Sequence, residues 1–294
     1  MVTPSTSLER LRVFHAVSTS GTVAGAARSL GYTPSAVSQQ LAALERESGV
    51  ALVERSNRGV VLTPAGEVMA RRSGEVLDLV RTAFEDVARA ADRHHTTLSI
   101  ASFPTAIPTL LMPVRQQLAP EIDIVVVDAE PEQALQLVEA HEADAAITDA
   151  DAVDLRSTDL HRTLIRMDPL RLVTPQGRTV RSLGECAHDR WVLGGPHTRH
   201  GDAARRVCRA AGFEPNVIVE TEDHHIAFDV VQAVGAVTLL PELALVDMPK
   251  GVVIAKKVDV GHVRRVEFVT RSTLRTNPAI VRFEQALTRA TVRP

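Results

Sequence analysis

The sequence predicts two regions of different fold class joined by one long helix. In roughly the first 63 residues, apolar side chains recur at helical spacing and a short hairpin pattern follows. From Leu98 onward, strand-like apolar runs alternate with helical stretches, which is typical of an α/β fold. A threonine and proline at 63 and 64 start the helix between the two regions. We therefore expect an all-α N-terminal domain, a linker helix and a C-terminal α/β domain.

Length and composition are those of a folded globular protein. The chain has 294 residues, of which 45% are hydrophobic and 23% charged, and its mean hydropathy is +0.02. No apolar run approaches the roughly 20 residues that cross a bilayer. The N-terminus lacks the apolar segment and cleavage site of a signal peptide. We therefore expect a cytoplasmic protein of two or three domains with no membrane partner.

Charge is distributed unevenly along the chain. The net charge is −3, but residues 1–73 contain eight arginines and five glutamates, a net of +3, which leaves −6 for the remainder. Lys250, Lys256 and Lys257 are the only lysines, so phosphate contacts would be made by arginine. The asymmetry favours a nucleic-acid partner for the N-terminal domain only weakly, because charged surfaces are common.

Three short helices are predicted within the first 50 residues. Each begins at a polar N-cap and ends at a glycine, in the pairs Ser7 and Gly21, Thr22 and Gly31, and Thr33 and Gly49. The second helix is rich in small residues, which lets a neighbouring helix pack closely. Two short helices joined by a three-residue turn form the arrangement that fits a B-DNA major groove.

The third helix carries the candidate residues for base recognition. Its start combines the N-cap Thr33 with Pro34 at the first helical position. Its buried stripe is predicted to consist of Val37, Leu41 and Leu44. That stripe turns three polar side chains outward near the N-terminus: Ser35, Ser38 and Gln39.

A hairpin is predicted directly after these helices. Apolar runs at 50–54 and 60–62 flank the turn residues 56–59. Arg58 lies at the tip, where an arginine can enter a narrow minor groove, and Arg55 at the strand end can hold a phosphate. The alternative is an ordinary helical bundle with a surface hairpin, which would leave these arginines solvated.

The helix that starts at Pro64 is expected to continue to about Arg93. A helix of this length is about 43 Å long at 1.5 Å per residue, too long to be buried within a small domain. Its apolar residues follow helical spacing over most of that length. We interpret it as a linker and dimerisation helix that pairs with a second copy of itself.

The C-terminal region is predicted to form two small α/β lobes with mainly parallel sheets. Nine strands are expected, at 98–101, 122–127, 145–148, 170–174, 191–193, 217–220, 236–240, 252–255 and 266–270. Five helices are expected, at 108–118, 131–141, 199–211, 226–234 and 278–290. Ligands of open α/β sheets bind beyond the carboxyl ends of strands and at helix N-termini. The candidate ligand-binding residues there are Ser102, Thr105, Thr148, His197 and Thr198.

These residues together resemble the LysR-type transcriptional regulators. The resemblance rests on AGAARSLGYTPSAVSQQLAALERESGVALVERSNRGVVLTPAGE at 24–67 and extends over essentially the whole chain. In the C-terminal region it rests on LSIASFPTAIPTLLMPV, ADAAIT, CRAAGFEP and VVQAVGAVTLLPELAL. The resemblance implies a winged helix-turn-helix, a linker helix and two periplasmic-binding-protein-like lobes that hold a small effector between them.

The resemblance also implies roles for individual residues. The recognition motif of the family falls on residues 33–38, so Thr33 and Pro34 are candidate DNA-binding residues too, although the family usually has glutamine in place of Pro34. Base recognition is therefore expected to shift to Ser35, Ser38 and Gln39. Arg58 occupies the wing position that the family places in the minor groove, and Thr105 matches a hydroxyl that often meets an effector carboxylate.

The resemblance further implies domain limits and partners. The expected divisions are a winged helix-turn-helix at 1–63, a linker helix at 64–93, a first effector lobe at 94–170 and 265–294, and a second at 171–264. The expected partners are a pseudo-palindromic double-stranded DNA site, a small-molecule effector, a second copy in a dimer or tetramer, and RNA polymerase.

Redox or metal sensing is an alternative within the second lobe. Cys186 and Cys208 both fall there, and a reversible disulfide between them would sense peroxide. No activating motif accompanies either cysteine, and Cys208 lies on a helical pattern typical of a buried structural residue. The histidines at 188, 197, 200, 224 and 225 follow no recognised metal-ligand spacing.

An enzyme is the alternative from a different functional class. The sequence contains no G-x-S-x-G, no P-loop, no G-x-G-x-x-G and no H-E-x-x-H motif. The adjacent pair Gly194 and Gly195 is too short to indicate a phosphate-binding loop. We therefore expect no catalytic residues and no cofactor.

Overall fold

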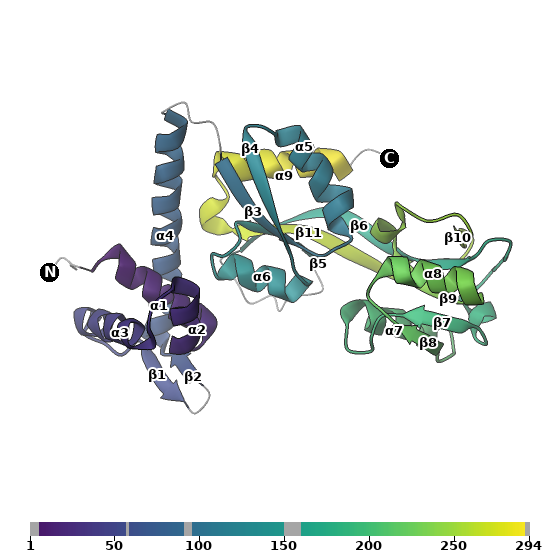
Figure 1. The fold of residues 1–294 in the computed structure, drawn as a ribbon, viewed down its shortest axis with the longest axis horizontal. Coiled ribbons are helices and arrows are strands. Elements are labelled where there is room, and N and C mark those ends of the chain that lie inside the picture. Colours follow the sequence, from purple (N-terminus) through teal and green to yellow (C-terminus); the bar gives the residue numbers. More distant parts are fainter. Residues whose placement is uncertain (1–5, 57–58, 91–95, 150–159, 292–294) are drawn as a thin grey trace.

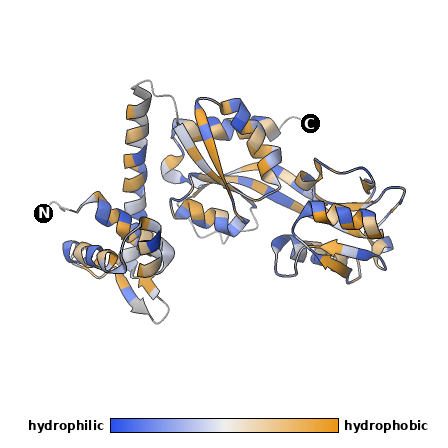
Figure 2. Cartoon of the chain, in the orientation of Figure 1, coloured by the Kyte–Doolittle hydropathy of each residue, from blue (hydrophilic) through white to orange (hydrophobic). Residues whose placement is uncertain are grey.

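The structure, a computed structural model, describes residues 6–56, 59–90, 96–149 and 160–291. Figure 1 shows a small N-terminal helical domain, a long helix that rises from it, and two α/β lobes beyond that helix. The predicted fold class is confirmed. The hydropathy colouring of Figure 2 places apolar residues on the strands and on the helix faces turned toward them.

The N-terminal domain consists of three helices and a hairpin. The helices are α1 (Leu8–Ser20), α2 (Val23–Leu30) and α3 (Pro34–Ser48), and the strands are β1 (Val53–Ser56) and β2 (Gly59–Leu62). The predicted caps are confirmed, because the Ser7, Thr22 and Thr33 side chains each accept a bond from a first-turn amide. The three terminal glycines adopt the left-handed conformation that favours glycine, with φ between 64° and 72°.

The predicted stripe of α3 is buried and forms part of two small apolar clusters. Val37 packs with the small residues of α2, and Leu41 and Leu44 pack around Phe14 of α1. The Glu45 carboxylate accepts the backbone amide of Leu52 at 2.8 Å, so α3 also fixes the start of the hairpin. This packing fixes the orientation of α3 and leaves its opposite face exposed.

Helix α4 (Pro64–Ala90) connects the N-terminal domain to the first lobe. Its 27 residues span about 40 Å at 1.5 Å per residue. Five of its large apolar side chains are exposed, and at 3.6 residues per turn they fall on one half of the helix: Val68, Val76, Leu79, Phe84 and Val87. Its opposite side contributes the buried Asp78.

The first lobe is a five-stranded region of the sheet covered by helices on both faces. Its strands are β3 (Thr96–Ser102), β4 (Ile122–Asp128), β5 (Ala145–Asp149), the first part of β6 (Leu160–Pro175) and β11 (Val263–Arg271). Helices α5 (Met112–Leu118) and α9 (Pro278–Thr291) lie on one face, and α6 (Pro131–Glu139) lies on the other (Figure 1). A π-helical turn, η1 (Ile107–Leu111), precedes α5, and a 3-10 turn, η5 (Ser272–Leu274), follows β11.

The second lobe is built around the buried side chain of Trp191. Its strands are β7 (Arg190–Leu193), β8 (Asn216–Glu220), β9 (Val237–Pro241), β10 (Val252–Ile254) and the last part of β6. Its helices are α7 (Arg199–Ala210) and α8 (His224–Val234), with the 3-10 turns η3 (Leu183–Cys186) and η4 (Glu242–Leu245). These elements surround one large apolar cluster and two smaller ones.

The prediction of mainly parallel sheets is wrong for the strands that connect the lobes. β3 pairs in parallel with β4 and β5, and β7 pairs in parallel with β8 and β9. β6 and β11, however, run between the lobes and pair antiparallel with each other. β6 pairs with β11 up to Pro169 and with β9 from Leu170 onward, so the change of partner marks the crossing point.

Candidate functional site

The N-terminal turn of α3 presents small polar side chains on the surface. Ser35 and Gln39 are exposed, and Ser38 is half-buried. Thr33 is exposed, but its hydroxyl accepts a first-turn backbone amide at 3.2 Å and is therefore engaged in capping. Pro34 occupies the first helical position and has no amide to leave unpaired. The surface available to a groove is therefore made by residues 35, 38 and 39.

The hairpin is fixed to the turn between α1 and α2. The Val60 amide donates to the Gly21 carbonyl at 2.8 Å, and Gly59 has a φ of 139°. A Cβ at Gly59 would lie 2.5 Å from that carbonyl oxygen, so only glycine fits there. Arg55 belongs to β1 opposite Val60, and Arg58 lies outside the described residues. Gly59 thus sets the hairpin position, a role that the sequence analysis did not identify.

A cavity of about 470 Å³ lies between the two lobes. Its lining comes from segments of both lobes and from the crossing strands: Phe103, Glu130, Pro131, Glu132, Asp149, Leu170, His197, Thr198, Arg199, His200, Ala203, Glu222, Pro241, His262 and Arg264. We call this cavity the interlobe cleft. The starts of α6 and α7 both border it, which brings helix N-termini from opposite lobes to one site.

Two of the five predicted ligand-binding residues line the interlobe cleft. His197 and Thr198 border it at the start of α7. The Thr198 hydroxyl donates to the Gly195 carbonyl at 2.8 Å and accepts the Gly201 amide at 3.1 Å. Gly201 fits closely, because a Cβ there would lie 2.1 Å from the Gly195 oxygen. Thr198 therefore shapes the wall of the cleft while its hydroxyl is engaged in capping.

The other three predicted residues support the cleft from behind. Ser102 and Thr148 are fully buried, and their hydroxyls donate to the carbonyls of Phe103 and Pro131. Both acceptor residues line the cleft. The Thr105 hydroxyl accepts a bond of 3.3 Å from the Arg264 guanidinium. None of the three lines the cavity directly.

Arg264 is a central residue of the cleft that the sequence analysis did not name as a ligand-binding candidate. Its Nε and Nη2 lie 3.1 and 2.5 Å from one carboxylate oxygen of Asp168, which is fully buried. Its guanidinium carbon lies 4.3 Å from the ring centroid of Phe103. The signal in the sequence was the acidic Asp168 two residues before the predicted strand at 170–174, since buried carboxylates require a partner.

An ion pair joins the two lobes at the edge of the cleft. Arg199 at the start of α7 donates through Nε and Nη2 to Glu132 of α6, at 3.0 and 2.6 Å. The Glu222 carboxylate accepts the Gly195 amide at 2.9 Å from within the second lobe. The cleft therefore combines cationic and anionic groups from both lobes.

Two family models together match most of the chain. Residues 8–67 match the bacterial regulatory helix-turn-helix protein model of the lysR family, and residues 91–291 match the LysR substrate binding domain. The chain belongs to the LysR family. It is a LysR-type transcriptional regulator with an effector-binding domain.

Two curated relatives and one solved structure illustrate the family. The HTH-type transcriptional regulator YofA of Bacillus subtilis (strain 168) is 27% identical over 238 residues, 80% of this chain and 81% of that protein. The probable hydrogen peroxide-inducible genes activator of Mycobacterium xenopi is 35% identical over 144 residues, 48% of this chain and 76% of that protein. The structure of full-length LysG from Corynebacterium glutamicum with bound effector Arg has a TM-score of 0.64, 19% identity and 98% coverage of both chains, and shows a shared fold.

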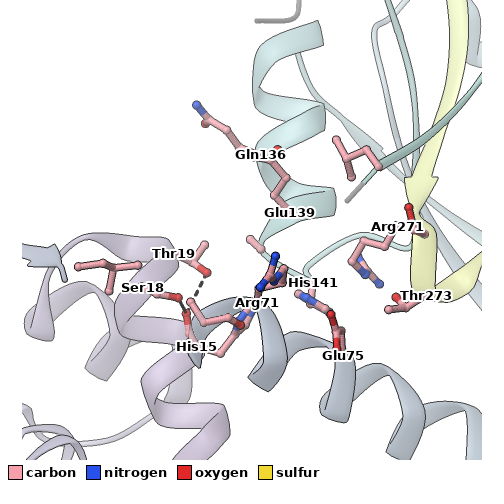
Figure 3. A pocket seen from close by; sticks show the side chains of 15 residues that line it. His15, Ser18, Thr19, Arg71, Glu75, Gln136, Glu139, His141, Arg271 and Thr273 are labelled. Atoms are coloured by element: carbon pink, nitrogen blue, oxygen red, sulfur yellow. Dashed lines mark hydrogen bonds between the residues drawn. The ribbon is translucent and has the colours of Figure 1, made fainter. Parts of the chain in front are cut away.

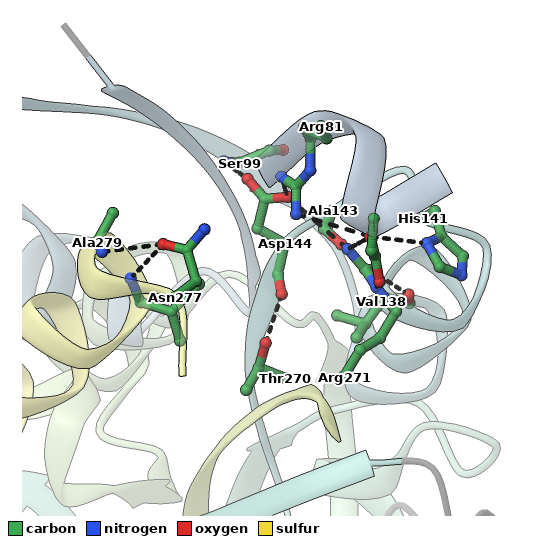
Figure 4. A network of polar contacts seen from close by, with 12 residues as sticks. Arg81, Ser99, Val138, His141, Ala143, Asp144, Thr270, Arg271, Asn277 and Ala279 are labelled. Atoms are coloured by element: carbon green, nitrogen blue, oxygen red, sulfur yellow. Dashed lines mark hydrogen bonds and ion pairs between the residues drawn. The ribbon is translucent and has the colours of Figure 1, made fainter. Parts of the chain in front are cut away.

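The LysR-type regulator also has a buried polar network where α4 meets the first lobe. Asp78 of α4 accepts bonds from Arg271 at 2.9 and 3.1 Å, from Thr273 at 2.5 Å and from His141 at 3.0 Å. Arg271 also donates to the carbonyls of Val138 and Ala143 (Figure 4). We call these residues, with the ion pair between Arg81 and Asp144, the junction network.

The junction network adjoins the N-terminal domain of this regulator. His15 of α1 stacks edge-on against His141, with ring centroids 4.4 Å apart. Burial, together with the neighbouring His141, lowers the pKa of His15 to about 4. A cavity of about 450 Å³ beside this contact is lined by residues of α1, α4, α6 and the end of β11 (Figure 3). The linker helix thus contacts one end of β11, and the N-terminal domain contacts His141 of the same network.

The two cysteines of the second lobe do not line the interlobe cleft, whereas His197 and His200 do. Cys186 and Cys208 are fully buried in one apolar cluster, and neither forms a disulfide. Burial raises the pKa of each thiol to about 12. Within the described ranges, no group of three His, Cys, Asp or Glu side chains can hold a metal ion. Among the described helices of this regulator, none is long and apolar enough to cross a membrane.

Proposed function

We propose that α3 of this LysR-type regulator is its recognition helix and that Ser35, Ser38 and Gln39 contact base edges in the major groove. The exposure of Ser35 and Gln39 and the partial exposure of Ser38, on the face opposite the buried stripe, support this role. Gln39 has the amide that pairs bidentately with adenine, and serine hydroxyls contact several bases. Arg55 and Arg58 of the hairpin contact a phosphate and the minor groove, respectively.

The active species is a dimer, or a tetramer built from dimers, that binds a pseudo-palindromic site. A net charge of +3 in residues 1–73 supports only weak binding by one copy. Linking two copies makes the second contact intramolecular, which raises affinity without a new contact. The exposed apolar half of α4 is the surface that pairs. DNA and RNA polymerase as partners place the regulator in the cytoplasm.

The effector binds in the interlobe cleft, and β11 carries its effect to the linker helix. The observation that supports this proposal is the position of two arginines on one strand. Arg264 at the start of β11 borders the cleft, and Arg271 at its end holds Asp78 of α4. The two positions are about 23 Å apart at roughly 3.3 Å per residue. A shift of the lobes therefore moves the α4 attachment, which changes the geometry of a dimer on DNA.

The domain division follows the same crossing strands. We propose 1–63 for the winged helix-turn-helix, 64–93 for the linker, 94–170 with 265–294 for the first lobe, and 171–264 for the second. The change of β6 pairing between Pro169 and Leu170 supports the boundary between the lobes.

The recognition helix is tested by DNA binding in solution, with no effector required. A site is first selected from bound genomic fragments, and binding of labelled duplexes is then measured by fluorescence anisotropy. Gln39→Ala is expected to weaken binding to that site by about 1–3 kcal/mol and to leave binding to unrelated DNA unchanged. Gln117→Ala, an exposed glutamine of α5, is the matched control. Equal affinities of Gln39→Ala and wild type for the selected site would refute the assignment.

Peroxide sensing is the second candidate function, favoured by the name of the M. xenopi relative. Against it, thiols with pKa values near 12 are almost wholly protonated at neutral pH, and the thiolate is the reactive species. We expect mass spectrometry after peroxide treatment to show both cysteines unmodified in the native protein. Rapid formation of a disulfide between Cys186 and Cys208 would instead establish the redox function.

A further inference from the structure

The interlobe cleft is lined by more carboxylates than arginines. Arg264 is neutralised by Asp168, which lies behind the cavity, and Arg199 is neutralised by Glu132. Besides Asp149 of β5, two further carboxylates line the cavity, Glu130 and Glu222. Within the described part of the chain, neither of these two carboxylates takes part in an ion pair with an arginine or lysine.

Glu130 and Glu222 come from opposite lobes and act on each other. Glu130 is the N-cap residue of α6 in the first lobe, and its side chain makes no capping bond. Glu222 follows β8 in the second lobe, where its carboxylate accepts the Gly195 amide. Burial raises the pKa of Glu130, and Glu222 is the next largest cause, followed by Asp128 and Glu132, whereas the cation of Arg264 lowers it to a smaller extent. Like charges therefore face each other across the cleft.

Other ionisable groups of the interlobe cleft do not neutralise this excess of negative charge. His200 also lines the cleft, and burial lowers its pKa, so its neutral form is favoured beside Glu222. The interlobe ion pair between Arg199 and Glu132 holds the two lobes together at the edge. The cleft is thus bridged by one pair of opposite charges, Arg199 and Glu132. It is also lined by two like charges from opposite lobes, Glu130 and Glu222, which are both exposed to solvent.

We propose that the effector of this regulator carries a primary ammonium group, which binds between Glu130 and Glu222 and joins the two lobes. An ammonium has three donors on a compact charge, which suits carboxylates that approach from two sides. Its binding removes the repulsion between the lobes, so closure and ligand binding are coupled. This inference rests on the proposed effector role of the cleft and adds the chemical class of the ligand.

Two sources of an ammonium group fit the remaining walls. In an amino acid, the carboxylate would face the start of α7, whose first-turn amides and Arg199 lie on the cleft. In a diamine, the chain between the ammonium groups would contact Phe103, Leu170 and Pro241. The shared chemistry is the ammonium group, and a comparison of the two compound classes separates the sources.

The test is a binding screen of the full chain by thermal shift, followed by titration calorimetry of each compound that stabilises it. The probes are L-arginine, L-lysine, L-leucine, putrescine and agmatine, set against succinate and benzoate, which lack an ammonium group. We expect at least one ammonium compound to bind and the two carboxylates to leave the midpoint unchanged. Stabilisation by amino acids alone, or by diamines alone, would identify the source of the ammonium group. Stabilisation by succinate or benzoate only, or by no ammonium compound, would overturn the proposal.

Variants of the two carboxylates localise the binding. Glu222→Gln and Glu130→Gln should each weaken the binding compound at least about 10-fold, because a charge-assisted contact is lost. Glu214→Gln, an exposed carboxylate of the same lobe, is the matched control and should leave affinity unchanged. Without ligand, both cleft variants should melt at or above the wild-type midpoint, since a repulsion is removed and the amide oxygen at 222 still accepts the Gly195 amide.

The outcomes separate this inference from the proposed function. Unchanged affinity in both cleft variants would overturn the inference even if an amine binds elsewhere. A carboxylate that binds in the cleft and alters DNA binding would overturn the ammonium proposal and leave the effector role standing. Failure of the DNA-binding test with Gln39→Ala would affect the recognition helix alone.

Discussion

The recognition surface of α3 and the interlobe cleft are both polar, but they are assembled in different ways. The first is made by three side chains within five consecutive residues, oriented by a cap and a buried stripe. The second draws its lining from segments between residues 103 and 264. A local surface depends on the stability of one helix, whereas the cleft depends on the strands and the junction that hold two lobes in place. Substitutions in the two regions should therefore have different consequences.

The largest effect is expected at the end of β11 that is remote from the cleft. Arg271→Met removes the main partner of the buried Asp78 carboxylate and should lower the free energy of unfolding by about 3–5 kcal/mol. Adding Asp78→Leu should recover part of this loss, because no buried charge then lacks its partner. Urea unfolding of the single and the double variant measures both changes in unfolding free energy. Arg206→Ala, which breaks an exposed ion pair of α7, should cost less than about 1 kcal/mol. A similar loss of unfolding free energy in Arg271→Met and Arg206→Ala would refute the importance of the junction network.

The next effect is a pH dependence at the contact between α1 and the first lobe. The His15 ring faces His141 of the first lobe, Arg271 of β11 and the Ala70 and Ala140 carbonyls. The pKa of His15 is about 4 in the folded protein and about 6.5 in the unfolded chain. As pH falls below about 6.5, His15 therefore becomes protonated first in the unfolded chain. The contribution of neutral His15 to the free energy of unfolding is complete above pH 6.5. It is lost between about pH 6.5 and 4, at about 1.4 kcal/mol per pH unit.

Substitution of His15 should remove that slope. Urea unfolding of His15→Gln at intervals between pH 6.5 and 4.5 is expected to show a smaller fall than wild type. Ser18→Ala alters another residue beside the same cavity, keeps the imidazole and should retain the wild-type slope. Parallel curves for wild type and His15→Gln would show that this imidazole does not carry the pH dependence.

A smaller effect is expected where α7 meets the cleft. Gly201→Ala places a Cβ 2.1 Å from the Gly195 oxygen and should cost about 1–3 kcal/mol by forcing the first turn of α7 outward. Because α7 starts at the cleft, the same substitution should also weaken binding of any ammonium compound found in the screen. Gly184→Ala in the same lobe meets no atom closer than 4.0 Å and is the control. Equal thermal midpoints of the two variants would contradict the close packing.

The contrast between the two regions also explains what could be predicted from sequence. Caps and terminal glycines act over four or five residues, so the three N-terminal helices were predicted closely. The first ten residues of β6 were missed, because Arg162 and Arg166 interrupt the apolar pattern and are buried only in part. The partial burial of Arg166 is explained by its ion pair with Glu242, at 2.8 Å and 76 residues away along the chain.

The cleft could be predicted only in outline. The start of α7 was recognised as part of a ligand site, since a threonine cap before a helix is a local signal. Glu130, Glu222 and Arg264 become neighbours only after β6 and β11 cross between the lobes, and no local spacing records that crossing. The general rule that ligands bind beyond strand ends therefore identified supporting hydroxyls, such as Ser102, along with residues of the cavity wall.

The smallest effect separates the stability of α3 from its recognition chemistry. Thr33→Ala removes the capping bond to a first-turn amide and should lower the free energy of unfolding by about 1 kcal/mol. Ser35→Ala lies two residues later on the exposed face, where no described bond of its hydroxyl is lost, and should change it by less than about 0.5 kcal/mol. Both should weaken binding to the selected DNA site, but only the cap variant should do so through stability. Equal losses of stability in the two variants would show that the hydroxyl of Thr33 is not the cap.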